Sequence, residues 1–214
     1  AAVENLPVLA DAQQQVLGRV DSALTLVSHK STGASLTFDS IDPEISADGR
    51  YVVFTSSSSG LADGDGNVYA DVYLSDMQTG TTTLISACPN PTAATNGASG
   101  KASISADGSV IAFSSLATTF VSGDTNDARD IFVYDTSTKT LKLASSSAAG
   151  VEGNGSSDQA SVSGDGHYVA FTSTSSNLAG STVNPNGEIC VKNLSSGAIS
   201  RASAALHGEA ANGV

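Results

Sequence analysis

Short apolar runs separated by polar turns recur along most of this chain, and one such segment occurs three times. Each copy has a Ser-x-Asp-Gly turn followed directly by a run rich in Val, Ile, Ala and Phe. The serines of the three turns, Ser46, Ser105 and Ser163, are 59 and then 58 residues apart. A fixed period of this size predicts one supersecondary unit that is repeated in tandem.

Each repeat is predicted to contain four short strands, because β-branched and aromatic residues dominate four windows and no helical periodicity competes. The Asp-Gly pair between the first two windows predicts a hairpin. The second window is almost continuously apolar, which is typical of a strand covered on both faces. The predicted strands are Pro43–Ser46, Tyr51–Thr55, Val72–Ser75 and Thr82–Ser86 in the first repeat, Ala102–Ser105, Val110–Ser114, Ile131–Tyr134 and Thr140–Ala144 in the second, and Ala160–Ser163, Tyr168–Thr172, Ile189–Lys192 and Ala198–Ala202 in the third.

Four antiparallel strands repeated in tandem predict an all-β fold of β-propeller blades. The motif Ser-Ala-Asp-Gly-x-Tyr-Val-x-Phe, followed by Asp-Ile-Phe-Val-x-Asp and Thr-Gly, resembles the WD40-like (PD40) repeats of TolB-like propeller proteins. It is similar above all to their bacterial secreted branch, whose longer loop carries Gly-Asp-x-Asn-x-x-x-Asp. The match covers roughly residues 22–214 and is cleanest at 104–146. The resemblance implies a propeller fold, and roles that are mostly binding and scaffolding.

The two ends of the chain look like parts of further repeats. Ala23–Ser28 resembles a fourth strand, and Gly208–Gly213 resembles the linkers that precede a repeat. Propellers typically close with four to eight blades. Three blades plus one strand therefore predict part of a larger propeller, completed by another chain or by a second copy in a homo-oligomer.

Residues 1–21 stand outside the repeat and are predicted to form a short helix or an arm that packs on the propeller, with a partner-docking segment as the alternative. Residues 22–214 are assigned to the partial propeller. Its three repeats are placed at about residues 42–87, 101–146 and 159–203.

Composition narrows the class of partner. The chain has 9 basic and 21 acidic residues and a net charge of −12, so we expect no nucleic-acid partner, whereas acidic loops attract cations. No apolar run approaches the ~20 residues that span a bilayer, so no transmembrane segment is expected. Scarce charges with abundant Ser, Thr, Ala and Gly are typical of a secreted, periplasmic or cell-surface β protein.

The two cysteines, Cys88 and Cys190, occupy non-equivalent positions in different repeats, so no disulfide framework is indicated. Cys190 takes the place of Tyr73 and Phe132 of the other copies. It is therefore expected to be a small buried hydrophobic residue.

The long loop of each repeat is the candidate metal site. The first two loops share the pattern Asp-x-Asn-x-x-x-Asp, and alternating side-chain oxygens followed by a carboxylate suit a hard cation such as Ca²⁺. In the alternative interpretation the same residues form Asx-turns, and the last aspartate accepts hydrogen bonds from backbone amides. The candidate ligands are Asp63, Asp65, Asn67 and Asp71 in the first loop and Asp124, Asn126 and Asp130 in the second. The third loop has Thr182, Asn184 and Glu188 at these positions, which predicts a weak or absent site.

Signals for catalysis are poor. The histidines His29, His167 and His207 fall at unrelated repeat positions, His167 on a solvent-facing turn, and no Gly-x-Ser-x-Gly elbow is present. The turn aspartates Asp48, Asp107 and Asp165 are explained by hairpin geometry. No catalytic residue is therefore assigned.

The leading hypothesis is a noncatalytic secreted or periplasmic propeller module that binds a protein or glycan partner, with structural calcium in its loops. The first alternative is a structural subunit of a cell-surface assembly that pairs with other chains through open blade edges. A second alternative, a hydrolase, requires a convergent acid/base set in the loops.

Overall fold

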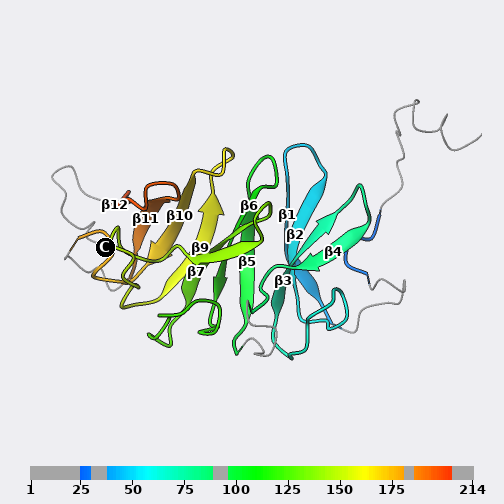
Figure 1. Cartoon of the computed structure of the whole chain (residues 1–214), viewed down its shortest axis with the longest axis horizontal. Coiled ribbons are helices and arrows are strands. Elements are labelled where there is room, and N and C mark those ends of the chain that lie inside the picture. Colours follow the sequence, from blue (N-terminus) through cyan, green and yellow to red (C-terminus); the bar gives the residue numbers. More distant parts are fainter. Residues whose placement is uncertain (1–24, 30–37, 89–95, 181–185, 204–214) are drawn as a thin grey trace, which may run out of the picture.

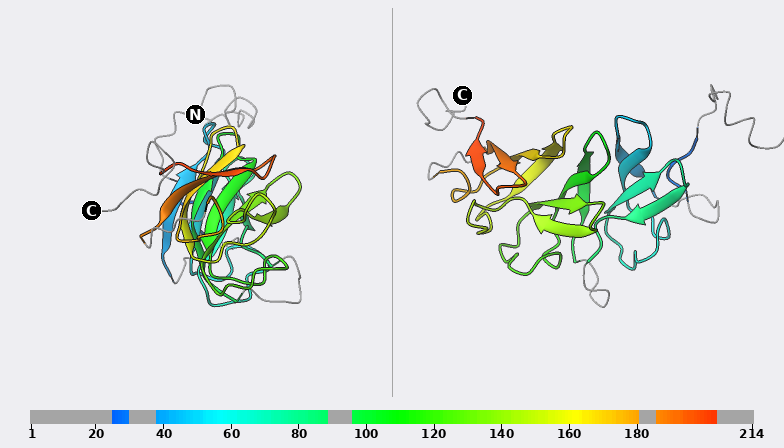
Figure 2. Two further views of the ribbon diagram at one scale, coloured as in Figure 1. Left: turned by 90° about the vertical axis from the view of Figure 1, so that its left-hand side faces the viewer. Right: turned by 45° about the horizontal axis from the view of Figure 1, so that its top comes forward.

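The computed structural model describes residues 25–29, 38–88, 96–180 and 186–203. These residues form twelve strands in three four-stranded antiparallel sheets, each a meander in chain order, and contain no helix. The three sheets stand side by side in chain order (Figure 1). Viewed along the row, they lie one behind another (Figure 2). The predicted all-β architecture of propeller blades is confirmed.

The strand bounds agree with the predicted windows to within two residues, except that each first strand begins three residues earlier. The first blade contains β1 (Ser40–Ile45), β2 (Tyr51–Ser56), β3 (Asp71–Asp76) and β4 (Thr81–Leu84); the second contains β5 (Ser99–Ile104), β6 (Val110–Ser115), β7 (Asp130–Asp135) and β8 (Thr140–Leu143); the third contains β9 (Ser157–Val162), β10 (Tyr168–Ser173), β11 (Glu188–Asn193) and β12 (Ile199–Arg201).

A β-bulge explains the difference at the first strands. The pairing of β1 with β2 shifts between Ile41 and Glu44, and the pairs β5/β6 and β9/β10 shift at the corresponding place. One residue in each bulge has a positive φ and is not glycine: Asp42 (52°), Lys101 (51°) and Gln159 (58°). Left-handed residues of this kind interrupt the period-two pattern by which a strand is read from sequence.

The hydrophobic core lies between neighbouring blades. One cluster joins residues of the first blade, such as Val53 and Val72, to Ile111 and Phe113 of the second. An equivalent cluster joins the second blade to the third. Strand β5 contacts β1, β2 and β3, and β9 contacts β5, β6 and β7, so the first strands of the second and third blades pack against the blade before them.

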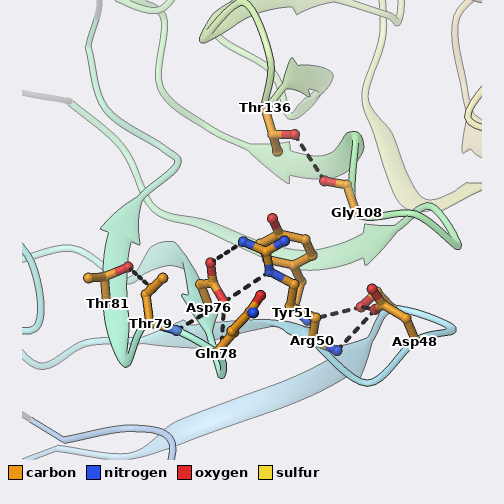
Figure 3. A network of polar contacts seen from close by, with 10 residues as sticks. Asp48, Arg50, Tyr51, Asp76, Gln78, Thr79, Thr81, Gly108 and Thr136 are labelled. Atoms are coloured by element: carbon orange, nitrogen blue, oxygen red, sulfur yellow. Dashed lines mark hydrogen bonds and ion pairs between the residues drawn. The ribbon is translucent and has the colours of Figure 1, made fainter.

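The hairpins of the first two blades also meet, through the ring of Tyr51. Arg50 donates to both carboxylate oxygens of Asp76, at 3.2 and 2.8 Å, and its guanidinium carbon lies 4.7 Å from the centre of the Tyr51 ring. Figure 3 shows Arg50 bonded to Asp76 and lying against Tyr51. The Tyr51 ring in turn packs on Gly108 of the second blade, where an added Cβ would be 2.4 Å from Cδ2 of the ring. The Gly108 carbonyl accepts a hydrogen bond from Thr136 at 3.0 Å.

The first blade has an apolar face that the described residues leave open. Ile45 is 61% exposed, whereas its counterparts Ile104 and Val162 are 8% and 9% exposed. Ile41 and Phe38 are exposed on the same blade. The difference follows from packing: β5 and β9 each lie against a preceding blade, and β1 has no such neighbour among the described residues.

The predictions for the ends of the chain fall mostly outside the description. Residues 1–21 and Gly208–Gly213 are not among the described residues. Of Ala23–Ser28, predicted as a fourth strand, the described part begins at Thr25, and residues 25–29 form no strand. The His29 amide donates to the Val27 carbonyl at 3.1 Å, and among the described residues no ladder pairs this segment with a neighbouring strand.

Cys190 is buried, opposite Phe171 in the β10/β11 ladder, and both cysteines are free thiols. In the part of the chain that is described, no helix has the length and apolar character needed to cross a membrane.

Candidate functional site

The three turn aspartates hold the hairpins together. Asp48 accepts hydrogen bonds from the Ser46 hydroxyl at 2.6 Å and from the Arg50 amide at 3.0 Å, and the Ser46 hydroxyl accepts from the Tyr51 amide at 2.9 Å. The Ser46 hydroxyl and the Arg50 amide lower the pKa of Asp48. The same contacts recur at the other two turns, with Asp107 and Asp165. The three carboxylates are therefore engaged in hydrogen bonds within their own turns, as the hairpin spacing predicts.

The first long loop satisfies its acids internally. Asp71 is fully buried and accepts from the Ser86 hydroxyl at 2.5 Å and from the Asn67 side-chain amide at 2.8 Å. Asp65 accepts from the Tyr73 hydroxyl at 2.6 Å and from the Asn67 backbone amide at 3.4 Å. Burial raises the pKa of Asp71, and the bonds from Ser86 and Asn67 oppose that rise. Each of these four carboxylate oxygens has a protein donor. Asp63, also predicted as a ligand, is exposed at the start of the loop.

The second long loop repeats the first contacts but not the last. Asp130 is fully buried and accepts from the Ser145 hydroxyl at 2.5 Å and from the Asn126 side-chain amide at 2.9 Å. Asp124 is 8% exposed, and its buried Oδ1 has no hydrogen-bond partner among the described residues. A third acid, Glu152, approaches from the linker between β8 and β9. Oxygens of Asp124, Asp130 and Glu152 all lie within 4.8 Å of one another.

One aromatic substitution accounts for the unpaired oxygen. Tyr73 and Phe132 occupy the same ladder position in β3 and β7, opposite Phe54 and Phe113. The Tyr73 hydroxyl reaches Asp65, whereas Phe132 has no hydroxyl to offer Asp124. The Phe132 ring instead packs edge-on against Phe120 of its own loop, with ring centres 5.1 Å apart.

The electrostatics of the second loop reflect this crowding. Burial, followed by the like charges of Asp130 and Glu152, raises the pKa of Asp124 to about 7. Burial also raises the pKa of Asp130, against the hydrogen bonds from Ser145 and Asn126. Buried carboxylates at this separation are destabilised in their charged form unless a cation or donor balances them.

The third blade keeps an acid at the start of its third strand. Glu188 is buried, accepts a short hydrogen bond from Ser203, and lies 3.9 Å from the Arg201 side chain. Thr182 and Asn184, the other two counterparts of the loop motif, lie outside the described residues. The expectation that this loop is a weak or absent site stays a prediction.

The bulges of the three first strands border an open groove of about 450 Å³. Lys101 is paired with Asp158 across the second and third blades at 2.6 Å, and Glu44 accepts from the Ile104 amide at 3.2 Å. The bulge positions themselves carry an acid, a cation and an amide. The groove is lined by Asp42, Pro43, Glu44, Lys101, Ala102, Gln159 and Ala160.

A second cavity of about 410 Å³ lies between the second and third blades. Lys192 at its wall is 6% exposed and donates to the carbonyls of Ser146 and Ser147, at 2.6 and 3.0 Å, and to the Ser146 hydroxyl at 3.2 Å. Burial lowers the pKa of Lys192. Because the three ammonium protons have acceptors, this lysine ties the third blade to the linker before it.

Known structures with similar blades include TolB from Acinetobacter baumannii, with 20% identity over 80% of this chain and 34% of that chain, and a TM-score of 0.48. The putative TolB from Agrobacterium tumefaciens has 16% identity over 77% of this chain and 46% of its own, with a TM-score of 0.49. The tricorn protease has 16% identity over 73% of this chain and 14% of its own, with a TM-score of 0.45. This chain resembles TolB.

These similarities concern the fold alone, and the bacterial secreted branch indicated by the loop motif stays a prediction. The chain spans about a third to a half of the two TolB chains. No family model matches the sequence. No curated protein matches it either. The relatives' own activities and partners therefore give this TolB-like chain no function by themselves.

Of the three acids in this cluster, the loop motif includes Asp124 and Asp130 but not Glu152. In sequence, Glu152 stands two residues before the Asn154-Gly155 pair of the linker, where the preceding linker has Ala94 before Asn96-Gly97. The signal for this added acid is therefore the difference between the two linkers. Of the histidines, His167 is exposed, with its Nδ1 3.2 Å from Asp165, and His207 is outside the described residues.

Proposed function

We propose that this chain is a noncatalytic, secreted or periplasmic β-propeller module that binds a protein or glycan partner, with structural calcium bound in the region of its long loops. The groove along the first strands is the observation that carries the proposal. Its volume of about 450 Å³ is within the range of ligand sites, and it crosses three blades.

The groove combines a constant backbone with variable chemistry. The bulge recurs in all three blades with nearly the same φ, but its residues are Asp42, Lys101 and Gln159. Non-glycine residues at positive φ are uncommon and are associated with functional sites. A carboxylate, an ammonium and an amide in one row offer donors and acceptors to sugar hydroxyls or to an extended peptide.

Arrays of immobilised oligosaccharides and peptides test the proposal, with each ligand that binds titrated against groove variants. Lys101→Ala and Gln159→Ala are expected to weaken binding by about tenfold each, about 1.4 kcal/mol, as for loss of a hydrogen bond to a charged or polar group. Lys142→Ala is the matched control, because Lys142 lines the other cavity, between the second and third blades. Ligands lost with Lys142→Ala and kept by the groove variants would contradict the groove assignment.

The open apolar face of the first blade favours a second candidate function, that of a structural subunit paired with another propeller chain. Ile41, Ile45 and Phe38 are 53%, 61% and 63% exposed there. Contiguous exposed apolar residues mark interaction surfaces.

If the partner is a second copy of this chain, light scattering is expected to give a dimer near twice 21.3 kDa. Ile45→Asp should then give a monomer, and Val151→Asp, at an apolar residue that is 58% exposed, should leave the dimer intact. A wild-type monomer at all concentrations would contradict self-pairing.

A further inference from the structure

We propose that the chain carries a single Ca²⁺ site, formed by Asp124, Asp130 and Glu152 at the junction of the second and third blades. The first long loop, with the same sequence motif, is a metal-free structural loop. This inference rests on the calcium part of the proposed function and is independent of its partner-binding part.

Three carboxylates from two separate segments converge at this point. Asp124 and Asp130 belong to the long loop of the second blade, and Glu152 belongs to the linker that leads to β9. Their ligand atoms lie within 4.8 Å of one another. Hard oxygen ligands with a combined charge of up to −3 are what Ca²⁺ selects, and its flexible coordination accepts mono- and bidentate carboxylates.

One buried oxygen of this cluster has no hydrogen-bond partner among the described residues. Asp124 is more than nine-tenths buried, and its Oδ1 has no donor in the part of the chain that the structure describes. Buried polar atoms are nearly always hydrogen-bonded or bound to an ion, so an exception within an acidic cluster needs an explanation. A cation between the three acids would satisfy this oxygen and remove their mutual repulsion.

Neighbouring groups hold the linker acid over the loop. The Thr125 amide and hydroxyl donate to the Glu152 carboxylate at 3.0 and 3.1 Å. The Asn126 side-chain amide donates both to Asp130 and to the Gly153 carbonyl, at 2.9 and 2.8 Å. The three acids are therefore positioned by contacts that join loop to linker, in the way that outer-shell contacts orient metal ligands.

The first loop lacks both features of the site. The Tyr73 hydroxyl and the Asn67 amide already donate to the two oxygens of Asp65. Among the described residues, no third carboxylate joins Asp65 and Asp71. In sequence, Ala94 stands where the next linker has Glu152. The shared motif thus builds the loop, and the linker acid completes the ion site.

Calorimetric titration of the chelator-treated full chain with CaCl₂ tests the inference. The expected result is one bound ion per chain. Glu152→Gln, which retains an acceptor for Thr125, and Asp124→Asn are each expected to weaken binding by about tenfold or more, because affinity follows the charge of the ligand set. Asp65→Asn, the counterpart of Asp124→Asn in the first loop, is expected to change affinity by less than about twofold. Circular dichroism in EDTA checks that all three variants are folded.

The possible results separate the two levels of the proposal. Absence of calcium binding at millimolar concentration would overturn both this inference and the calcium part of the proposed function. Two ions per chain, or an equal loss in Asp65→Asn and Glu152→Gln, would keep calcium in the loops and overturn the single junction site. Neither result affects the proposal that a partner binds in the groove, which the array experiment tests separately.

Discussion

The long loops of the first and second blades carry the same Asp-x-Asn-x-x-x-Asp pattern and the same contact between a buried aspartate and a serine. The two loops differ in the hydrogen bonding of the first aspartate of the pattern. In the first loop Asp65 is paired with Tyr73. In the second loop Asp124 is left with an unpaired buried oxygen beside Glu152. The local motif is therefore sufficient to specify a loop conformation. Under the proposed single calcium site, whether that loop also holds an ion depends on two residues outside it, Phe132 and Glu152.

The buried aspartate at the start of the third strand gives the largest expected effect. Asp71→Ala leaves the Ser86 hydroxyl and the Asn67 amide without their acceptor, at a cost of about 4 kcal/mol of unfolding free energy. Asp130→Ala in EDTA should cost less, because it also removes one of three like charges. Urea unfolding of both variants measures the difference.

An equal loss in the two variants would show that the second cluster carries no repulsion in the absence of calcium. Ser86→Ala and Ser145→Ala are the matched controls. Each removes the same donor without changing a charge, so their losses of unfolding free energy should agree with each other.

The hairpin glycines of the same two blades give the next effect. Gly49 and Gly108 have φ of 73° and 74°, so alanine brings the same backbone strain of about 1 kcal/mol at both. At Gly49 an added Cβ meets nothing within 4 Å, whereas at Gly108 it would lie 2.4 Å from the Tyr51 ring. Gly108→Ala should therefore cost about 3 kcal/mol, and Gly49→Ala about 1 kcal/mol.

Thermal unfolding of both glycine variants is the measurement. Gly166→Ala should give a loss of stability between those of the other two variants, since an added Cβ there would lie 3.0 Å from Cγ2 of Val110. The same loss at all three glycines would mean that the hairpins do not pack on the preceding blade.

The features that the sequence predicts best are those with a local signal that repeats. The Asp-Gly turns, three of the four strands of each blade and the burial of Cys190 follow from short patterns. The bulges at Asp42, Lys101 and Gln159 could not be predicted, since their positive φ is imposed by pairing with the next strand and not by residue type. Glu152 was missed for a related reason. Its proximity to Asp130 is created by the packing of a linker on a loop.

The aromatic position in the third strand gives a smaller effect. Tyr73→Phe removes the donor to Asp65 and is expected to cost about 1.5 kcal/mol. Phe132→Tyr should supply a donor near Asp124, raise stability in EDTA and weaken calcium binding. A double-mutant cycle of Tyr73→Phe with Asp65→Asn measures the coupling in the first loop. Zero coupling there, or unchanged calcium affinity in Phe132→Tyr, would show that this position does not decide the state of the acid.

The smallest expected effect is on stability at acidic pH. The hairpins of the first and second blades should differ here because only the first has an arginine beside its turn aspartate. Arg50 donates to Asp76 in the first blade, and its counterpart in the second blade is Ser109. The bond from Arg50, with help from the Gln78 and Thr79 amides, lowers the pKa of Asp76 to about 2. A lowered folded-state pKa stabilises the fold above the unfolded value near 3.8, and this contribution is lost as the pH falls toward 2.

Arg50→Gln should therefore be less stable than the wild type between pH 5 and 7, and the two should converge as the pH approaches about 2. The pair is partly exposed, so the difference is expected to be small and to shrink with added salt. Unfolding free energies of the variant and the wild type, measured at several pH values, give the comparison.

Lys139→Gln is the control. It removes a cation from the corresponding turn of the second blade, where the pKa of Asp135 is lowered by Ser137 and Thr138. Its difference from the wild type should not change with pH over this range. A constant difference for Arg50→Gln as well would mean that Asp76 owes its low pKa to the turn amides, and that the two hairpins differ in packing alone.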